Sequence, residues 1–479
     1  MLSSLAVKQR ALDLGFDLAG IAPIAVWKDL EFSRQWVEKG FNGEMRYLEN
    51  PKRFDPHLVL ASAQSVICVG LVYNTPRRSQ ESEVRSQNKE ERKFEGRAQS
   101  SVAGSRLPVT GNNGQRTTDN GRLGTSSYQL PVSSFHFPVS EAAAPRAWVS
   151  RYAWGQDYHE IMWAKLEQLG AAVEELAPGV ETRAFVDTGP VVERAFARFS
   201  GIGWMGKNTC IINQEKGSWF FLGVILTSLE LAPDLPAPDR CGSCTACLEA
   251  CPTEALVEPY VMDASRCISY FTIEIKGAFP ERLRPKIGAN VFGCDICQDV
   301  CPWNGGASRQ LSVVSCQSQD FSRKPSAISY QQSPSAQRQS RDEHCFKQAA
   351  TTKVPQFQPM TFAPIRPMLE EGSARKQLTT DDGRLATDNG PPTTDAAGSS
   401  LFNPPLDVLA LITEDDFRRI FAHSPIKRVK YRGWLRNLCV AMGNSGDERF
   451  VPWLEQAAQH SDPILREHAA WALDRLRSK

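Results

Sequence analysis

"CGSCTACLEACP" (Cys241–Pro252) contains four cysteines, which are separated by two, two and three residues and followed by a proline. The first three cysteines of such a loop can bind three irons of one [4Fe–4S] cluster. In two-cluster ferredoxins the cysteine before the proline binds the other cluster. The motif therefore predicts that Cys251 leaves the first cluster, which must take its fourth ligand from elsewhere in the chain.

A second motif, "CDICQDVCPWN" (294–304), provides the missing ligands. It also ends in Cys-Pro, so by the same crossing rule Cys301 returns to the first cluster. The first predicted ligand set is Cys241, Cys244, Cys247 and Cys301. The second is Cys251, Cys294, Cys297 and Cys267, the last being the one other cysteine between 241 and 301. Two zinc sites or buried structural thiols are the alternatives. Paired CxxC units suit zinc, but zinc does not explain two Cys-Pro endings.

The composition indicates in which compartment the protein is expected, but it excludes no class of binding partner. The formal net charge is +1, which excludes no partner because local patches matter more than the sum. No long apolar stretch follows a basic start at the N-terminus, and the longest apolar run, 219–226, is far shorter than the ~20 residues that span a bilayer. We therefore expect a soluble, cytoplasmic protein with no membrane partner, in which clustered cysteines bind metal rather than form disulfides.

Changes in composition divide the chain into domains. The hydrophobic fraction of 41% is below the ~45–50% usual for globular chains, so part of the chain is expected outside the folded core. Two polar, aperiodic stretches, 76–146 and 305–400, are predicted to be disordered insertions. The predicted domains are an α/β (α+β) catalytic core with a mixed sheet at 1–75 and 147–235, a ferredoxin-like two-[4Fe–4S] domain at 236–304, and an all-α, HEAT-like domain at 401–479.

One carboxylate of the core is a candidate for chemistry. A strand is predicted over 182–189, and it ends in Asp-Thr-Gly before a helix. Ligands of α/β folds bind beyond the carboxyl ends of strands, which makes Asp187 a candidate site residue. The alternative is that its side chain caps the following helix.

The C-terminal segment contains a basic stretch, "IKRVKYRGWLR" (426–436), which has five basic residues and no acidic one. Tyr431 and Trp434 are interleaved with these charges. Such a pattern suits the phosphate backbone of a nucleic acid. The alternative is a solvated helix face whose aromatic residues are buried.

In combination, the motifs resemble those of the epoxyqueuosine reductase family, the cobalamin-dependent iron–sulfur enzymes of queuosine biosynthesis. The resemblance covers nearly all of the chain outside the two insertions. Besides the eight cysteines, it rests on "GEMRYL" (43–48), "SRYAWGQDYH" (150–159), "FVDTGPVVERAFA" (185–197), "GIGWMGKNT" (201–209), "RCISYFTIEIKG" (266–277), "FGCDICQDVCPWN" (292–304) and "YRGWLRNLCVAMGN" (431–444).

This resemblance implies an activity. The core would bind cobalamin, and the clusters would reduce its cobalt to the nucleophilic Co(I) state. The substrate would be epoxyqueuosine at the wobble position of a tRNA anticodon. Two electrons and two protons would remove the epoxide oxygen as water and leave queuosine. The electron donor is not identified by the sequence, and we expect the chain to act as a monomer.

The resemblance also assigns roles to residues of this chain. Asp187 would be the general acid, kept protonated by a dry pocket. The residues expected to bind the cofactor are Arg53, Ser150, Asp187, Asn208, Cys210 and Ser269. The residues expected to bind tRNA are Lys276, Lys427, Arg428 and Lys430. For Arg53 and Lys276 the alternative is an ordinary exposed charge.

Two other functions remain open at this stage. A cobalamin-dependent iron–sulfur reductive dehalogenase would share the catalytic module, but the missing export signal and the basic helical C-terminus argue against it. A non-catalytic iron–sulfur electron carrier or tRNA-binding scaffold is the second alternative. A carrier, however, would need little more than the cluster module.

Overall fold

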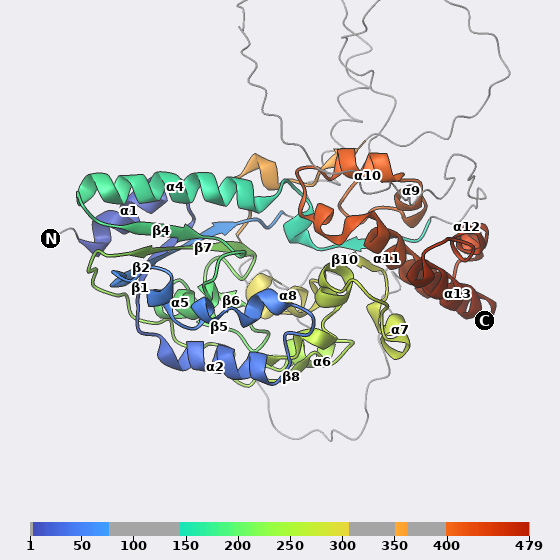
Figure 1. The fold of residues 1–479 in the computed structure, drawn as a ribbon, viewed down its shortest axis with the longest axis horizontal. Coiled ribbons are helices and arrows are strands. Elements are labelled where there is room, and N and C mark those ends of the chain that lie inside the picture. The colour runs from blue at the N-terminus through green and yellow to red at the C-terminus, as the bar shows by residue number, and fades with distance from the viewer. Residues whose placement is uncertain (1–2, 76–143, 306–349, 363–398, 479) are drawn as a thin grey trace, which may run out of the picture.

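The computed structural model describes residues 3–75, 144–305, 350–362 and 399–478. These residues form an elongated molecule with the main β-sheet at one end and the C-terminal helices at the other (Figure 1). The cysteine-rich module lies along one side between them. Within the described ranges, no helix combines the length and the apolar character that crossing a bilayer requires.

The main sheet has four strands in the order β1-β2-β7-β4, and each neighbouring pair is antiparallel. Its strands are β1 Leu18–Pro23, β2 Ser65–Val72, β7 Phe220–Thr227 and β4 Thr182–Phe185. The prediction of a mixed sheet was wrong, and the core is of the α+β kind.

Helices cover both faces of this sheet, which explains why β2 and β7 are apolar along their whole length. These helices are α1 Ser4–Asp13, α2 Trp27–Glu38, α4 Tyr158–Leu176 and α5 Glu193–Phe199. Along β2, Ile67 and Val69 pack with α1 and α4, whereas Val66 and Cys68 pack with α2 and α5. The alternation is the period of two that a strand imposes on its side chains.

The cysteine-rich module is built from short elements. They are α6 Ala246–Ala250, β8 Leu256–Glu258, β9 Val261–Met262, α7 Arg284–Ile287, β10 Asn290–Phe292 and α8 Ile296–Asp299. Strand β10 pairs in parallel with β3, Trp148–Val149, so the module is hydrogen-bonded to the segment before α4. A small hairpin of β5 (Trp204–Met205) and β6 (Ile211–Ile212) packs against Cys301.

The C-terminal end is helical, as predicted. Its helices are α9 Leu406–Ala410, α10 Glu414–Ile420, α11 Lys430–Ser445, α12 Val451–Ala457 and α13 Pro463–Arg477. Trp434 of α11 and Trp453 of α12 are fully buried in the core that these helices share. Trp154 and Phe292 belong to the same apolar cluster. The helical end therefore shares its hydrophobic core with the cysteine module and with the segment before α4.

Part of one predicted insertion belongs to the folded core. The ring of Phe357 is buried and lies edge-on to Phe221 of β7, with centroids 5.1 Å apart. The backbone N–H of Met360 donates to the carbonyl of Trp154 at 2.7 Å. Residues 361–362 pair as β11 (Thr361–Phe362) with β12 (Ser399–Ser400). The prediction of disorder is thus wrong for 350–362 and 399–400. Its remainder, and most of the stretch 76–146, lie outside the described residues.

Candidate functional site

The first predicted ligand set is gathered beside the β5–β6 hairpin. Cys241 and Cys301 pack against Trp204. Burial raises the pKa of Cys301 to about 12, and the thiols of Cys241 and Cys247 contribute to the rise. Burial raises the pKa of Cys247 to about 11, and the thiols of Cys244 and Cys241 contribute to that rise. Thiols that influence one another's ionisation lie near one another, which places these four cysteines in the same part of the module. Cys210 also contributes to the raised pKa of Cys301.

The second predicted set is gathered on the other side of the module. Cys267 and Cys294 share an apolar cluster. Burial raises the pKa of Cys294 well above its ordinary value, and Cys267 and Cys251 add to the effect. The same three cysteines act on the fourth member, Cys297. These neighbours are compatible with the crossed ligand sets, and the assignment of individual cysteines to the two clusters stays a prediction.

One turn of the core holds both cysteine loops. Lys207 Nζ donates to the carbonyl oxygens of Gly242 at 2.6 Å and Cys244 at 3.0 Å, in the first loop. The neighbouring side chain, Asn208, is buried, and its Nδ2 donates to the carbonyl of Cys297 at 3.1 Å, in the second. Two adjacent residues therefore fix the two cysteine groups against the same part of the core.

Three more of the residues expected to bind the cofactor lie near the second cysteine group. Ser150 Oγ donates to the buried carboxylate of Asp295. Burial raises the pKa of Cys267, and hydrogen bonds from Ser269 offset part of the rise. Cys210 acts electrostatically on Cys297.

Arg53 lies elsewhere and holds a different segment. Its Nη1 donates to the carbonyl oxygen of Gly189 at 2.6 Å. Gly189 belongs to the loop between β4 and α5, which also carries Asp187. Arg53 is therefore a structural support of the Asp187 loop, whichever ligand it also contacts.

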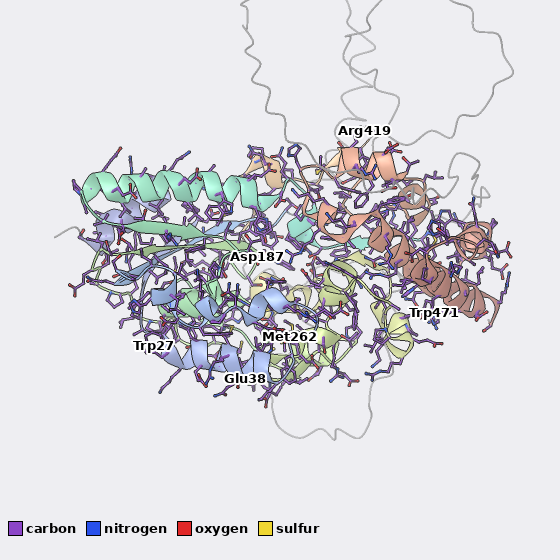
Figure 2. All side chains as sticks on the ribbon, in the orientation of Figure 1. Trp27, Glu38, Asp187, Met262, Arg419 and Trp471 are labelled. Atoms are coloured by element: carbon purple, nitrogen blue, oxygen red, sulfur yellow. The ribbon has the colours of Figure 1, made fainter. Side chains whose placement is uncertain are left out.

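Asp187 lies near the centre of the molecule, between the main sheet and the C-terminal helices (Figure 2). Its φ of 48° falls in the left-handed region, which residues other than glycine seldom occupy outside strained functional segments. Tyr158 Oη donates to Asp187 Oδ2 at 2.9 Å. His159 Nε2 lies 3.7 Å from the same oxygen. Both partners come from the first turn of α4.

Two predictions for Asp187 are corrected by this geometry. A dry pocket was expected to keep the acid protonated, but the side chain is 55% exposed. Desolvation raises its pKa, but the nearby His159, the hydrogen bond from Tyr158 and the charge of Arg428 outweigh that effect, and the pKa lies below its ordinary value. The helix-cap alternative is wrong as well, because the N-cap of α5 is Val192 and no side chain caps that end.

Phenols and one ion pair surround the carboxylate. Burial raises the pKa of Tyr47 to about 12, and it raises that of Tyr152 further. Arg428 Nη2 lies 2.9 Å from Glu274 Oε1, and its guanidinium carbon is 5.7 Å from the centre of the Tyr47 ring. The positive charge of Arg428 also lowers the pKa of Asp187. These groups come from four separate segments of the chain and meet only in the folded state.

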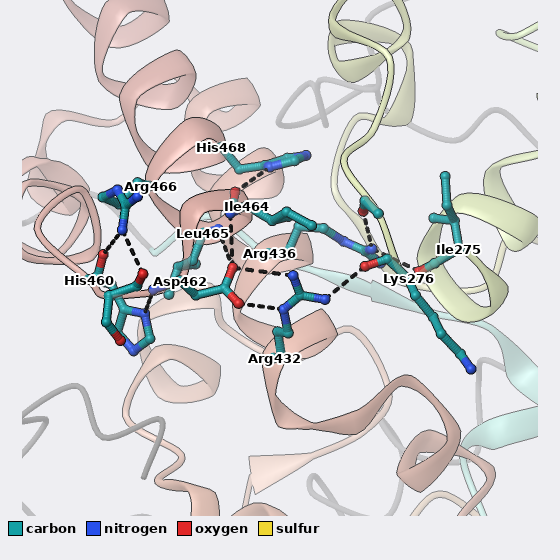
Figure 3. A network of polar contacts seen from close by, with 12 residues as sticks. Ile275, Lys276, Arg432, Arg436, His460, Asp462, Ile464, Leu465, Arg466 and His468 are labelled. Atoms are coloured by element: carbon teal, nitrogen blue, oxygen red, sulfur yellow. Dashed lines mark hydrogen bonds and ion pairs between the residues drawn. The ribbon is translucent and has the colours of Figure 1, made fainter. Parts of the chain in front are cut away.

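The four residues expected to bind tRNA differ in how they are paired. Lys427 Nζ lies 2.9 Å from Asp157 Oδ2, and Arg428 pairs with Glu274, as described above. The side chains of Lys276 and Lys430 are exposed. In Figure 3, the Lys276 side chain extends away from the polar network formed by its neighbours. All four remain candidates for contact with a large ligand.

The second half of the basic stretch has a structural role (Figure 3). Arg432 pairs with Asp462 at 2.6 Å and donates to the carbonyl of Lys276 at 2.9 Å. Arg436 is only 2% exposed, and it donates to the carbonyl oxygens of Phe271, Ile275 and Gly277. Tyr431 and Trp434 are buried. The two arginines hold the turn that follows Cys267, and the buried Arg436, Tyr431 and Trp434 are not available to a nucleic acid.

Sequence reasoning missed the partners of Asp187. Tyr158 and His159 stand in the motif "GQDYH", directly after Asp157, which caps α4 by accepting from the His159 backbone N–H at 3.2 Å. An aspartate with a histidine two residues later at a helix start was a usable signal. What it could not show is that the β4–α5 loop approaches this end of α4.

Two family models match the chain. The one described as a 4Fe-4S double cluster binding domain matches residues 240–304. The one described as "Epoxyqueuosine reductase QueG, DUF1730" matches residues 127–188, a range that includes Tyr158, His159 and Asp187. The first match shows a double [4Fe–4S] module where the cysteine spacing predicts it and decides against zinc.

Structures solved for epoxyqueuosine reductases have a similar fold. One from Bacillus subtilis, with its catalytic loop swung out of the active site, has a TM-score of 0.62 at 23% identity, over 98% of this chain and 90% of that one. Another, with a tRNA-Tyr stem loop modified with epoxyqueuosine, has a TM-score of 0.63 at 23% identity, over 98% and 89% of the two chains.

Two curated relatives are closer in sequence. The epoxyqueuosine reductase of Synechocystis is 37% identical over 299 residues, which are 62% of this chain and 82% of the relative. That of Xanthomonas campestris is 30% identical over 470 residues, which are 98% of this chain and 94% of the relative. Because this second similarity extends over almost the whole of both proteins, the chain belongs to the epoxyqueuosine reductase family.

Proposed function

We propose that this chain reduces epoxyqueuosine in tRNA to queuosine, using two [4Fe–4S] clusters and cobalamin. The observation that carries the proposal is the placement of Asp187. The ring centre of Tyr152 lies 6.2 Å from that of Tyr158, which donates to Asp187, and 6.0 Å from that of Phe292, which precedes Cys294 by two residues. An ionisable, half-exposed carboxylate therefore lies close to the electron-carrying module, as a reaction that combines electrons with protons requires.

The reaction sets what the residues must do. An epoxide that accepts two electrons and two protons loses its oxygen as water and becomes an alkene. The clusters would deliver the electrons one at a time from an external donor. They would be held by Cys241, Cys244, Cys247 and Cys301, and by Cys251, Cys267, Cys294 and Cys297. The epoxide oxygen is a poor leaving group until it is protonated, and that proton is the task of Asp187.

The core has polar groups that suit cobalamin, whose corrin ring carries amide side chains. Glu193 Oε1 is buried and lacks a hydrogen-bond partner among the described residues. Burial raises the pKa of Glu193 to about 7. A buried carboxyl oxygen of this kind is costly unless a ligand donates to it. An amide of the cofactor would be such a donor.

A cleft lined by Val192 and Arg194, the two neighbours of Glu193 in the chain, would take part of the same cofactor. It has a volume of about 150 Å³, and Arg53, Arg194, Met205 and Thr209 are among its lining residues. Sites for drug-sized ligands measure ~300–1,000 Å³, so this cleft would hold only a portion of cobalamin. Bound and reduced, cobalamin supplies the nucleophile that opens the epoxide. The residues proposed to hold it are Arg53, Ser150, Asp187, Asn208, Cys210 and Ser269.

The surroundings of Asp187 orient its carboxylate for proton transfer. The hydrogen bond from Tyr158 fixes Oδ2, and the bond from Arg53 to Gly189 holds the loop. The left-handed φ of Asp187 adds strain that the loop retains only because these contacts determine it. These contacts fix the orientation of the carboxylate, and its exposed side remains accessible to a bulky substrate.

The exposed cations beside the site suit the substrate's backbone. Lys276, Lys427, Arg428 and Lys430 are proposed to bind phosphates of the tRNA, which positions the RNA without reading its bases. The modified base would enter the site from an unstacked loop. The helical C-terminal end, whose α11 and α13 carry similar sequences, is proposed to be a HEAT-like tRNA-binding unit. The proposed enzyme is a cytoplasmic monomer.

The test is anaerobic turnover of tRNA that carries epoxyqueuosine, with cobalamin and a chemical one-electron reductant such as titanium(III) citrate. Conversion to queuosine is followed by mass spectrometry of the digested tRNA. We expect conversion only when cobalamin is added. A chain whose clusters are reduced and which binds cobalamin, yet leaves the modified tRNA unchanged, would be an electron carrier or scaffold instead.

A further inference from the structure

His159 lies between two carboxylates at the start of α4. Its Nδ1 is 2.7 Å from Asp157 Oδ1, and its Nε2 is 3.7 Å from Asp187 Oδ2. The ring is stacked on that of Tyr158, with centroids 4.2 Å apart. Asp157 is itself fixed, because it caps α4 and pairs with Lys427. The imidazole is therefore held in one orientation, and Nε2 points toward Asp187.

The Nε2 atom is buried and makes no hydrogen bond within the described part of the chain. A buried ring nitrogen without a partner is unfavourable. The gap of 3.7 Å to Asp187 is slightly longer than a hydrogen bond, and a small movement of the strained β4–α5 loop would close it. The geometry thus places a donor and an acceptor 3.7 Å apart, close enough to be joined by a small movement.

We infer that His159 is a positioning residue that stores a proton at Nε2 and passes it to Asp187, which then protonates the epoxide oxygen. This inference rests on the proposed function. It also resolves a difficulty in that function, because an Asp187 that is ionised at neutral pH has no proton of its own to give. Each turnover uses two protons and two electrons. His159 passes one proton through Asp187 to the oxygen, and solvent then protonates the ring again. The second proton reaches the oxygen from solvent and completes the water.

The charges around the ring favour its protonated form. Burial lowers the pKa of His159, but the hydrogen bond with Asp157 and the charges of Asp157 and Asp187 outweigh this and raise it to about 9. The positive end of the α4 dipole opposes protonation of the His159 ring. Lys427 also opposes it, because its ion pair with Asp157 offsets part of the negative charge that faces the ring. Glu160, the next residue, pairs with His423 at 3.3 Å. Because the folded-state pKa is raised, His159 carries its proton below about pH 9 and loses it above.

The experiment compares the parent chain with His159→Asn, Asp157→Asn and the control Glu160→Gln. Single-turnover rates are measured against pH after the loaded enzyme has been reduced, so that electron delivery does not limit them. We expect the parent rate to fall above about pH 9, and that of Asp157→Asn to fall from a lower pH. His159→Asn should lose this pH dependence and react ~10²-fold more slowly. Glu160→Gln should behave as the parent does.

A second readout needs no cobalamin. The imidazole of His159 is titrated by NMR in the full chain with oxidised clusters, and its signal is assigned by its absence in His159→Asn. We expect a pKa well above the ordinary ~6.5, which drops in both Asp157→Asn and Asp187→Asn. Asparagine remains a good helix cap, so Asp157→Asn is expected to fold.

The outcomes separate the two proposals. If the parent converts the substrate and His159→Asn matches its rate and pH profile, the role of His159 is wrong and the proposed function stands. A titration at or below the ordinary pKa likewise overturns the inference. If the cobalamin-loaded parent does not convert the substrate, the proposed function fails, and the inference fails with it.

Discussion

The cysteine module and the basic stretch at 426–436 both contain local clusters of one residue type, but they use them in opposite ways. The cysteines are gathered in one module, where their thiols raise one another's pKa. The basic residues diverge, since Arg428 lies beside Asp187, whereas Arg436 is buried and donates to three backbone carbonyls. Thiolate ligands of one cluster must converge, but a guanidinium is satisfied wherever acceptors are available. Spacing is therefore a reliable guide for the cysteines and a poor one for the arginines.

The largest expected effect breaks the cysteine side of this comparison. Cys267 is the predicted ligand of the second cluster that stands outside both cysteine motifs. Cys267→Ala removes it. We expect it to lose one [4Fe–4S] cluster, on the order of four irons per chain, and to keep the other. Iron and sulfide analysis of anaerobically purified protein measures this. Cys210→Ala is the control, because Cys210 lies near the same cysteines but belongs to neither ligand set. Full iron content in Cys267→Ala would refute the assignment.

The next effect concerns Asp187. Asp187→Asn keeps the size of the side chain and can still accept from Tyr158, but it cannot transfer a proton. We expect the single-turnover rate to fall by ~10²–10⁴, with unchanged iron content and cobalamin binding. Turnover within a few-fold of the parent would show that the proton reaches the epoxide by another route.

A third prediction sharpens the contrast within the basic stretch. Arg436→Met retains the length of the side chain but leaves buried carbonyl oxygens without a donor. We expect the free energy of unfolding to fall by about 3 kcal/mol, because a buried polar group without a partner costs ~1–3 kcal/mol. Urea unfolding measures the change. Lys430→Met, at an exposed position of the same stretch, should change stability by no more than ~0.5 kcal/mol. Equal effects of the two changes would contradict the assignment of Arg436 to the core.

The smallest effect concerns binding. Replacing Lys276 and Lys430 by alanine together should weaken tRNA binding and lower its log–log salt dependence by roughly 0.7–0.9 for each phosphate that the protein no longer neutralises. Fluorescence titrations at several salt concentrations give the slope. Cluster content and the reduction of added cobalamin serve as controls and should not change. An unaltered salt slope would mean that these two lysines face only solvent.

Some of the candidate site followed from short-range patterns. The two cysteine sets could be proposed from spacing and the Cys-Pro endings, and Asp187 from its position after a predicted strand together with the family resemblance. The antiparallel pairing of the main sheet could not be read in the same way, because β2 and β7 are apolar along their length and carry no mark of strand direction. Phe357 was assigned to an insertion because the sequence around it is polar, but its ring is buried against Phe221 of β7.

The sequence by itself determined the cluster chemistry. The cysteines of a ligand motif are only a few positions apart, so they can bind one metal cluster with little help from the rest of the fold. Only the tertiary structure decided which charges act on Asp187. The loop after β4, the start of α4 and the segment before α11 meet through long-range packing, and their meeting gives Asp187 the partners Tyr158, His159 and Arg428. The ionisation of a carboxylate depends on such neighbours and on burial rather than on the residues beside it in the chain. For that reason Asp187 could be proposed as the general acid from the sequence, but its protonation state could not.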